Sequence, residues 1–308
     1  MWFKNLRLYR FTRPFDTDTE TLTEKLQETA FRPCGKAERS RSGWVSPLGK
    51  ESESLCHGLG DYLMLCLQKE EKLLPATVIK DVLAERVEQI EAAQGRKVYR
   101  KERLQLKDEV EAELLPRAFS RTQKIHAYLA VQEDLLIINT SSATRAEELI
   151  NCLRESLGSV PVVPLSVAHA PSAIMTGWLQ RQEGSHHFAI DQECELFNPL
   201  EDSNVVRCKG QDLYSKEIMV HLEAGKQVKK LGVVWNQTLS CVLGNDLLIS
   251  RLKFEDMILE RAQDSNAETA AQQFDQDFAI MSLELSGFCK ALFAAFGGLQ
   301  ETTPTSVE

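Results

Sequence analysis

The stretch from Pro75 to Leu115 constrains the fold most, because almost every turn of it has helical character. Pro75 stands where a helix would begin, and Pro116 follows the stretch, since proline does not continue a helix. Gly95 interrupts it, so the pattern predicts two helices, the second over residues 98–115. An apolar stripe is expected on the first helix at Val78, Val82, Val87 and Ile90. Because the stretch is otherwise polar, we expect the helical pair to project from the body.

The segments on either side of this pair are typical of strands and short helices. Residues 61–68 form an apolar run before it, and residues 125–132 and 134–140 form two more after it. Ser142 is placed to cap a helix that Gly158 closes. Further helices are expected at 171–181, 214–224 and 267–296, the last with a break left open, and further strands at 160–167, 187–196, 204–209, 227–236, 238–243 and 247–254. The absence of a regular βαβ rhythm predicts an α+β fold with mixed, largely antiparallel sheets.

The length of 308 residues suffices for about two structural units. We expect an N-terminal α+β unit over residues 1–165, which includes the projecting helices 75–115, and a second α+β unit over residues 166–254. Residues 255–308 are expected to form an acidic helical segment packed on the body. The large apolar side chains that would form its core face are Phe274, Phe278, Leu285, Phe288, Leu292 and Phe296.

The formal net charge of −9 is distributed unevenly along the chain. Residues 255–308 contain ten acidic residues and two basic ones, Arg261 and Lys290, which gives −8. The first 254 residues therefore sum to −1, from 34 basic and 35 acidic residues. The sequence pI of 5.4 thus describes the C-terminal segment and does not argue against a basic surface elsewhere.

The first residues and the cysteines indicate the compartment. Residues 1–7 carry charges at once, which is unlike a signal peptide, and no uninterrupted apolar run approaches the roughly 20 residues that cross a bilayer. The eight cysteines form no C-x-x-C pair and no compact framework, which is typical of reduced, mostly buried thiols in a cytosol. We therefore expect a cytoplasmic protein with no membrane partner.

Motifs that would indicate catalysis are missing from the sequence. It contains no G-x-x-x-x-G-K-[ST] loop, no H-E-x-x-H and no G-x-S-x-G. His186 and His187 fall on an expected strand edge, where their rings would point to opposite faces. Asp275 and Asp277 diverge on an expected helix and suit its dipole better than a cation. We expect no enzyme activity, no cofactor and no metal.

Basic residues form three clusters. The first, residues 96–107, holds six basic residues and one acidic residue over roughly 18 Å of helix. Its candidates for phosphate contact are Arg96, Lys97, Arg100 and Lys101. The alternative for this cluster is a solvated helix face with i,i+4 charge pairs.

The other two clusters combine basic side chains with an aromatic ring or an amide. Phe119 stands between two arginines just past a helix end, and the third cluster begins at Arg207 and continues to Lys230. Their candidate DNA-binding residues are Arg117, Phe119, Arg121, Lys209, Gln211, Lys226 and Lys229. Basic groups supply affinity for phosphates, while amides and backbone N–H groups position the contact. Because no helix-turn-helix, zinc finger or stacking platform is visible, these clusters alone leave DNA binding open.

Several longer strings are more specific. They are M-W-F-K-N-L (1–6), K-E-E-K-L-L-P (69–75), L-K-D-E-V-E-A-E-L-L-P-R-A-F-S-R (106–121), L-R-E-S-L-G-S-V-P-V-V-P-L (153–165), Q-D-L-Y-S-K-E-I (211–218) and H-L-E-A-G-K (221–226). In order and without large gaps, the chain from Met1 to Gly298 resembles the recombination-associated RdgC family of proteobacteria.

The resemblance implies an α+β homodimer closed into a ring, whose positively charged hole encloses double-stranded DNA. It also implies binding without sequence preference, no catalytic activity, a nucleoid-associated location and restraint of the RecA recombinase during replication and recombination. The family's hole-lining positions fall on Arg117, Phe119, Lys209, Gln211 and Lys226. The family commonly has a second basic residue where this chain has Gly210, which leaves the strength of that contact open.

Two other functional classes are alternatives to a DNA-encircling ring. One is a protein-interaction module that contacts recombinase or replication factors and binds DNA only secondarily. The other is a nuclease, which would need carboxylates gathered around a metal, and the sequence shows no such arrangement. A non-enzymatic, non-specific DNA-binding ring dimer is therefore the prediction from the sequence.

Overall fold

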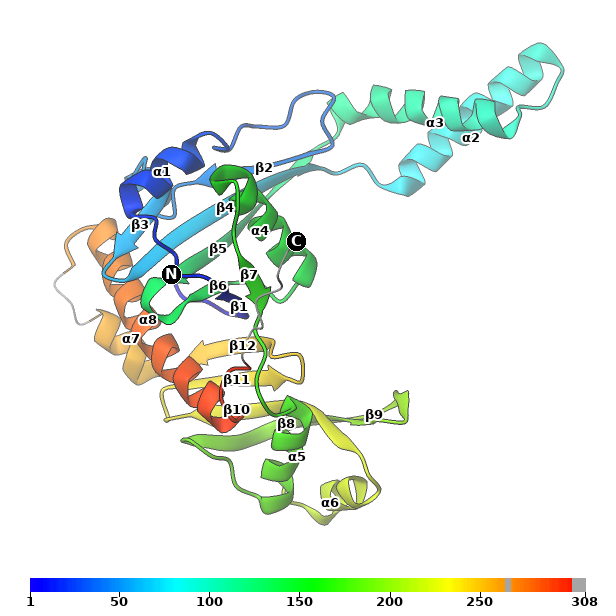
Figure 1. The fold of residues 1–308 in the computed structure, drawn as a ribbon. Coiled ribbons are helices and arrows are strands. Elements are labelled where there is room, and N and C mark those ends of the chain that lie inside the picture. The colour runs from blue at the N-terminus through cyan, green and yellow to red at the C-terminus, as the bar shows by residue number, and fades with distance from the viewer. Residues whose placement is uncertain (264–266, 301–308) are drawn as a thin grey trace, which may run out of the picture.

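The computed structural model describes residues 1–263 and 267–300, and its body curves as a crescent from which a helical hairpin projects (Figure 1). Two sheets form the body, and their strands pair antiparallel. The predicted α+β class with largely antiparallel sheets is therefore confirmed.

The first sheet is built around β4 (Tyr62–Lys72) and β5 (Ser120–Ala130), which pair over their full length. Its seven strands lie in the order β2-β4-β5-β6-β1-β7, with β3 also paired to β4. The other strands are β1 (Arg7–Phe11), β2 (Ser40–Val45), β3 (Cys56–Leu59), β6 (Leu135–Ile138) and β7 (Val162–Pro164). β4 and β5 thus form a long ribbon that carries the helical hairpin away from the body (Figure 1).

The second sheet has five strands in the order β12-β11-β10-β8-β9. They are β8 (Phe188–Asn198), β9 (Glu201–Lys209), β10 (Gln227–Trp235), β11 (Leu239–Gly244) and β12 (Ile249–Phe254), and each overlaps a strand predicted from the sequence. The register between β8 and β10 shifts between Val228 and Lys230, so Lys229 sits at an irregularity of the strand.

Helices α1 (Thr19–Gln27) and α4 (Ala143–Leu157) pack in one core cluster with the first sheet. Asp18 and Ser142 cap them, because their side chains accept hydrogen bonds from backbone N–H groups of the first turns. The part of the chain that holds the second sheet contributes α5 (Pro171–Arg181) and α6 (Lys216–Glu223). The short 3-10 turns are η1 (Gly49–Glu51), η2 (Leu115–Arg117) and η3 (Val131–Glu133).

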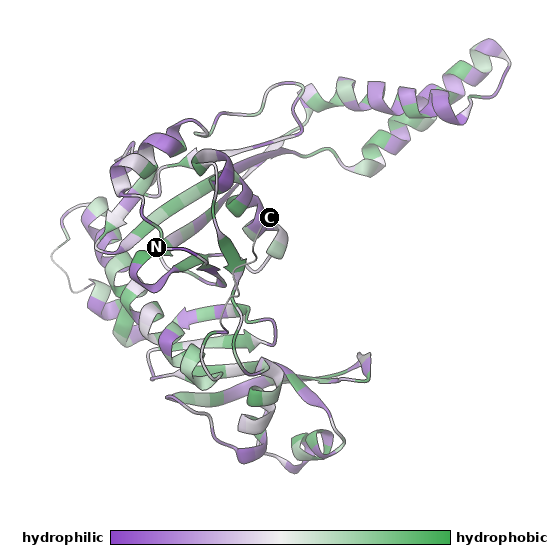
Figure 2. Ribbon diagram, viewed as in Figure 1, coloured by the Kyte–Doolittle hydropathy of each residue, from purple (hydrophilic) through white to green (hydrophobic). Residues whose placement is uncertain are grey.

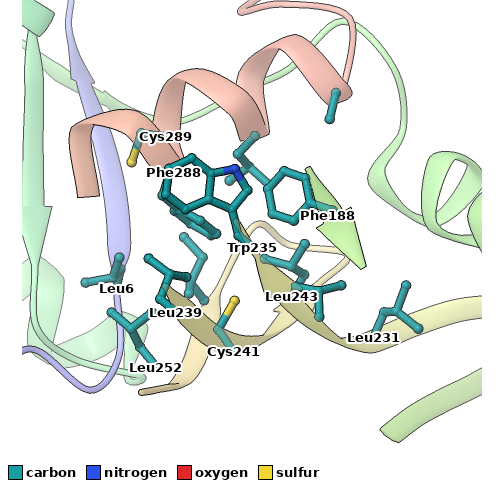
Figure 3. Close-up of a cluster of buried hydrophobic side chains, with 14 of the residues drawn as sticks. Leu6, Phe188, Leu231, Trp235, Leu239, Cys241, Leu243, Leu252, Phe288 and Cys289 are labelled. Atoms are coloured by element: carbon teal, nitrogen blue, oxygen red, sulfur yellow. The ribbon is translucent and has the colours of Figure 1, made fainter. Parts of the chain in front are cut away.

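The long helix α8 (Ala270–Ala295) joins the two sheets into one core. Phe278 lies edge-on to Tyr128 of the first sheet with 5.7 Å between ring centroids, and Phe288 lies edge-on to Trp235 of the second at 5.9 Å. Figure 3 shows Phe288 and Trp235 packed together in this cluster. A capping box at Thr269 begins the helix, which continues without the break left open by the sequence.

The N-terminal segment also connects the sheets through its backbone. Leu6 and Ile249 exchange two hydrogen bonds of 2.7 and 3.2 Å, and the Leu252 N–H donates to the Lys4 carbonyl at 2.8 Å. The shared core contains residues from all three predicted units, 1–165, 166–254 and 255–308. The structure therefore does not test where one unit ends and the next begins, and these boundaries stay predictions.

Helix α8 is long and apolar enough to span a membrane by length and composition alone. Half of its most apolar window is buried inside the protein, however, and its buried residues belong to the core between the sheets. The core therefore accounts for its apolar character.

Helices α2 (Ala76–Gln94) and α3 (Arg100–Leu114) form the projecting pair predicted from the sequence, and Figure 2 shows hydrophilic residues along much of it, with hydrophobic ones between them. Gly95 ends α2 in the left-handed conformation that favours glycine, with a φ of +62°. The predicted apolar stripe is wrong at Val78, which is 41% exposed. Ile79 and Leu83 are buried instead, because the face of α2 that packs inward is rotated by one residue.

Two local predictions also need correction. His186 and His187 lie in a turn before β8 with φ values of +53° and +67°, not on a strand edge, because the Phe188 N–H closes this turn onto the Ser185 carbonyl. Helix α7 (Asp256–Gln263) lies within the helical segment predicted over residues 255–308, but the individual helix expected there was only 267–296. All eight cysteines are free, and all but the half-buried Cys34 are buried, as expected.

Candidate nucleic-acid interface

The root of the hairpin presents an aromatic ring to solvent. Helix α3 ends in η2, where Leu115 is buried and anchors the chain. The Leu73 N–H then donates a 2.7 Å hydrogen bond to the Phe119 carbonyl, which fixes the entry to β5 against the exit from β4. The Phe119 side chain is 85% exposed. A large ring held this far out of the core is available for stacking.

Arg117 and Arg121 flank this ring, and both are exposed. Glu113, an acid close to Arg117 in sequence, pairs with Arg86 at 2.7 Å. Within the described residues neither flanking arginine forms an ion pair, so both charges are available to an anion. The hairpin root therefore combines two groups that can pair with phosphates and one that can stack on a base.

The segment between β9 and α6 presents the third basic cluster, and Lys209 is exposed at the end of β9. Gly210 follows with a φ of +65°, and its N–H donates a 2.7 Å hydrogen bond to the Gln192 carbonyl. This left-handed conformation favours glycine, and a Cβ added there would meet no atom within 4 Å. Gly210, which replaces the basic residue common in the family, therefore lies in a tight turn. A longer side chain at this position would extend into solvent, but the positive φ would strain its backbone.

Gln211 and Lys226 are held by local hydrogen bonds. The Gln211 amide donates to the Glu217 carboxylate at 2.9 Å, and the Lys226 ammonium donates to the carbonyl and side-chain oxygens of Asn204. Because the partners of Lys226 are neutral, its charge is not compensated. Lys226 lies just before β10 and Lys229 lies on it, and both are half-buried.

The cluster at the far end of the hairpin is partly neutralised. The Arg96 guanidinium donates to both carboxylate oxygens of Glu102 at 2.7 Å, and this hydrogen-bonded ion pair lowers the pKa of Glu102. Lys97, Arg100 and Lys101 are exposed and have no such partner within the described residues. Three of the four predicted residues here are therefore free to contact phosphates.

The second sheet carries an ion-pair ladder that the sequence did not reveal. Glu195 on β8 accepts from Arg207 at 3.1 Å and from Lys230 at 3.3 Å, and Arg251 on β12 pairs with Glu193 at 2.5 Å. Burial alone would raise the pKa of Glu195, but the two cations lower it. The paired residues lie on different strands, so the sequence does not show which of them meet. The only local signal is the exposed Arg251 between buried residues of β12.

No group of three or more histidine, cysteine or acidic side chains that could hold a metal occurs in residues 1–263 and 267–300. The pair His57 and Asp275, at 2.7 Å, joins β3 to α8 and faces the ring of Phe274. It therefore lies against the core rather than in a basic cluster.

Comparison with known proteins assigns the chain to a family. The family model described as "Putative exonuclease, RdgC" matches residues 1–299. A recombination-associated protein RdgC from Aeromonas hydrophila is 45% identical over 302 residues, which cover 98% of this chain and 100% of that protein. The chain belongs to the RdgC family. Proteins of the same name from Psychromonas ingrahamii and Pseudomonas aeruginosa are also 45% identical, over 300 and 299 residues, covering 97% of this chain and 99% and 98% of theirs.

The predicted DNA-contacting positions of this RdgC-family chain fall on two separate parts of the crescent. Arg117 and Phe119 lie where the hairpin leaves the first sheet, whereas Lys209, Gln211 and Lys226 lie near β9 and α6 at the opposite end (Figure 1). One chain therefore does not gather them into a single patch. A ligand that contacts both sets therefore has to extend from one end of the chain to the other.

Proposed function

We propose that this RdgC-family chain binds double-stranded DNA without sequence preference, encircles it as a ring-shaped homodimer and modulates RecA-dependent recombination and replication. In this proposal it acts at the nucleoid in the cytoplasm. The observation that carries the proposal is the pair of exposed cations at the two ends of the crescent, Arg117 and Lys209, neither of which forms an ion pair within the described residues.

The types of side chain support recognition of the DNA backbone. Lysine and arginine neutralise phosphates whatever the base sequence, and Gln211 and the loop backbone can position them. The sequence shows no helix-turn-helix or zinc-finger pattern that would read bases in the major groove. Binding is therefore expected to depend strongly on salt and weakly on sequence.

The crescent shape supports closure by a second copy. Large apolar side chains are exposed near both ends: Tyr99 and Leu104 beyond the turn of the hairpin, and Leu200 and Val220 near β9 and α6. Exposed apolar groups of this kind are candidates for contacts between subunits. A two-fold dimer would repeat every cation around one interior, so each contact would count twice.

We propose that the protein does this without cleaving DNA, although the matching family model carries an exonuclease description. Nuclease chemistry commonly uses acidic side chains around divalent metals. Prolonged incubation of linear and circular duplexes with the protein and Mg²⁺ is expected to leave the DNA intact. Loss of terminal nucleotides would overturn this part of the proposal and favour the exonuclease reading.

The deciding experiment compares dissociation from linear and circular duplexes of several sequences over a range of salt. Encirclement predicts slow escape from circles, faster escape from linear ends and a steep negative slope of log K against log salt. Equal dissociation from both forms would contradict the ring but leave simple DNA binding. No measurable DNA binding would favour the second candidate, a module that contacts recombinase or replication factors.

A further inference from the structure

A groove of about 280 Å³ lies at the root of the hairpin, between α2, α3 and the start of β2. Its apolar lining comes from Ile79 and Leu83, which follow each other by one turn on α2. None of the predicted DNA-contacting residues lines this groove. It is therefore a separate surface feature with its own chemistry.

The rim of the groove is positive although the whole chain is negative. Lys80 and Lys107 line it and form no ion pair within the described residues, while Arg39 pairs with Glu111 at 2.7 Å. Three basic groups and one acidic group give the lining a formal charge of +2, against −9 for the chain. Two uncompensated cations thus stand over an apolar floor.

The first turn of α2 adds to this positive potential. Pro75 precedes the helix and provides no side-chain cap, and the first turn contains no acidic residue. The N–H groups of a first helical turn lack partners within the helix, and the helix dipole makes this end positive. Ala76 in this turn lines the groove. A carboxylate bound here would meet both the helix end and the lysines.

We propose that this groove docks an acidic peptide segment of another protein, with an apolar side chain placed on Ile79 and Leu83 and carboxylates near Lys80 and Lys107. Charge complementarity favours an acidic occupant, and the apolar floor favours a peptide over a nucleic-acid backbone, which would make no use of it. A second copy of the chain fits less well, since a stable interface buries about 800 Å² per partner and this groove is only side-chain sized.

The test uses a fluorescent seven-residue probe peptide with five aspartates followed by leucine and phenylalanine, measured by anisotropy with the full chain. Ala76→Glu places a carboxylate in the groove while favouring the helix end, so it should weaken peptide binding about tenfold. Thr77→Glu is the matched control: it adds the same charge to the same exposed turn but does not line the groove. It should change binding by no more than about twofold.

Further variants test the charged and the apolar contacts of the peptide separately. Lys80→Glu and Lys107→Glu should each weaken the peptide about tenfold, and a probe with serine in place of leucine and phenylalanine should bind about tenfold more weakly. Arg117→Ala should leave peptide binding unchanged while weakening DNA binding, so that a failure of either proposal can be recognised separately.

Three outcomes would overturn the docking proposal. Absence of peptide binding, or equal effects of Ala76→Glu and Thr77→Glu, would show that the groove does not recognise acidic peptides. Displacement of the peptide by duplex DNA, with Lys80→Glu and Lys107→Glu weakening DNA binding as strongly, would assign the groove to DNA. Dissociation of a dimer by the peptide, seen by sedimentation, would assign it to contacts between copies.

Discussion

The guanidinium group of Arg96 donates two hydrogen bonds of 2.7 Å to the carboxylate of Glu102, across the turn that joins α2 to α3. The pair spans six residues and bridges the end of one helix to the first turn of the next. It removes Arg96 from the cations that are free to meet phosphates, while Lys97 beside it remains exposed.

Removing the carboxylate should therefore strengthen DNA binding. In Glu102→Gln the released Arg96 can pair with a phosphate, so the slope of log K against log salt should become steeper by about one. Arg96→Ala, in contrast, should alter affinity less than Lys97→Ala. Titrations of one duplex at several salt concentrations measure both effects. Weaker binding by Glu102→Gln would show that the ion pair itself presents the DNA-binding surface.

A single cation at either end of the crescent should contribute the same amount to DNA affinity whatever the base sequence of the duplex. Arg117→Ala and Lys226→Ala are each expected to weaken all duplexes alike and to make the salt slope shallower by about one. Lys50→Ala, an exposed lysine on η1 outside the predicted clusters, is the matched control. A loss confined to one sequence would contradict backbone recognition.

The exposed ring of Phe119 should matter for single strands and not for stability. Phe119→Ala is expected to leave the free energy of unfolding within about 0.5 kcal/mol, because the side chain is 85% exposed. Loss of one stacked base should weaken single-stranded DNA binding by about 1–3 kcal/mol. Anisotropy on single-stranded DNA and thermal unfolding check the two parts, and Phe119→Trp should retain the affinity.

His126 should make the protein less stable in mild acid. Burial lowers its pKa from 6.5 to about 4, with smaller contributions from the charges of Lys124 and the N-terminus. Below pH 6.5 this histidine takes up a proton in the unfolded chain, whereas in the folded chain it stays neutral until about pH 4. The free energy of unfolding is therefore not reduced by this group above pH 6.5, and it falls by up to about 3 kcal/mol as the pH is lowered towards 4.

Urea unfolding between pH 4 and 7 measures this dependence, and His126→Gln supplies the comparison. The variant should show a flatter loss of stability over that range, because glutamine takes up no proton. Parallel curves for the two proteins would show that other groups dominate the acid response.

The core between the sheets should unfold in a single cooperative transition. Phe288 is fully buried against Trp235, so Phe288→Ala should cost about 3–5 kcal/mol. Because α8 packs against both sheets, unfolding should remain a single transition, followed by far-ultraviolet circular dichroism and by tryptophan fluorescence together. Two separated transitions would show that the sheets are independent.

Local signals made much of the fold predictable. Pro75, Gly95 and Pro116 act through their own backbone restrictions, which is why the two projecting helices could be placed from sequence. Ser142 and Gly158 bounded α4 by local signals as well, the first through a side-chain cap and the second through its positive φ. The sheet order, with β1 between β6 and β7, depends on contacts between distant segments, and no local pattern encodes it.

The candidate site shows the same division. The basic clusters are contiguous in sequence and were recognised there, including Arg117 and Phe119 at the hairpin root. What escaped prediction is the compensation of charge: Glu195 meets Arg207 and Lys230 only because three strands align side by side. Arg251, paired with Glu193 across the sheet, was missed for that reason.

The register of the β4–β5 ribbon has a consequence for how this protein could diversify. Lys72 and Ser120 are directly paired, so the whole hairpin enters and leaves the body at one rung of the ladder. A tight two-residue turn could close the same rung without altering the strands below it. The helical hairpin is thus an insertion at one point of the sheet, and a longer or shorter hairpin there would leave the register of β4 and β5 unchanged.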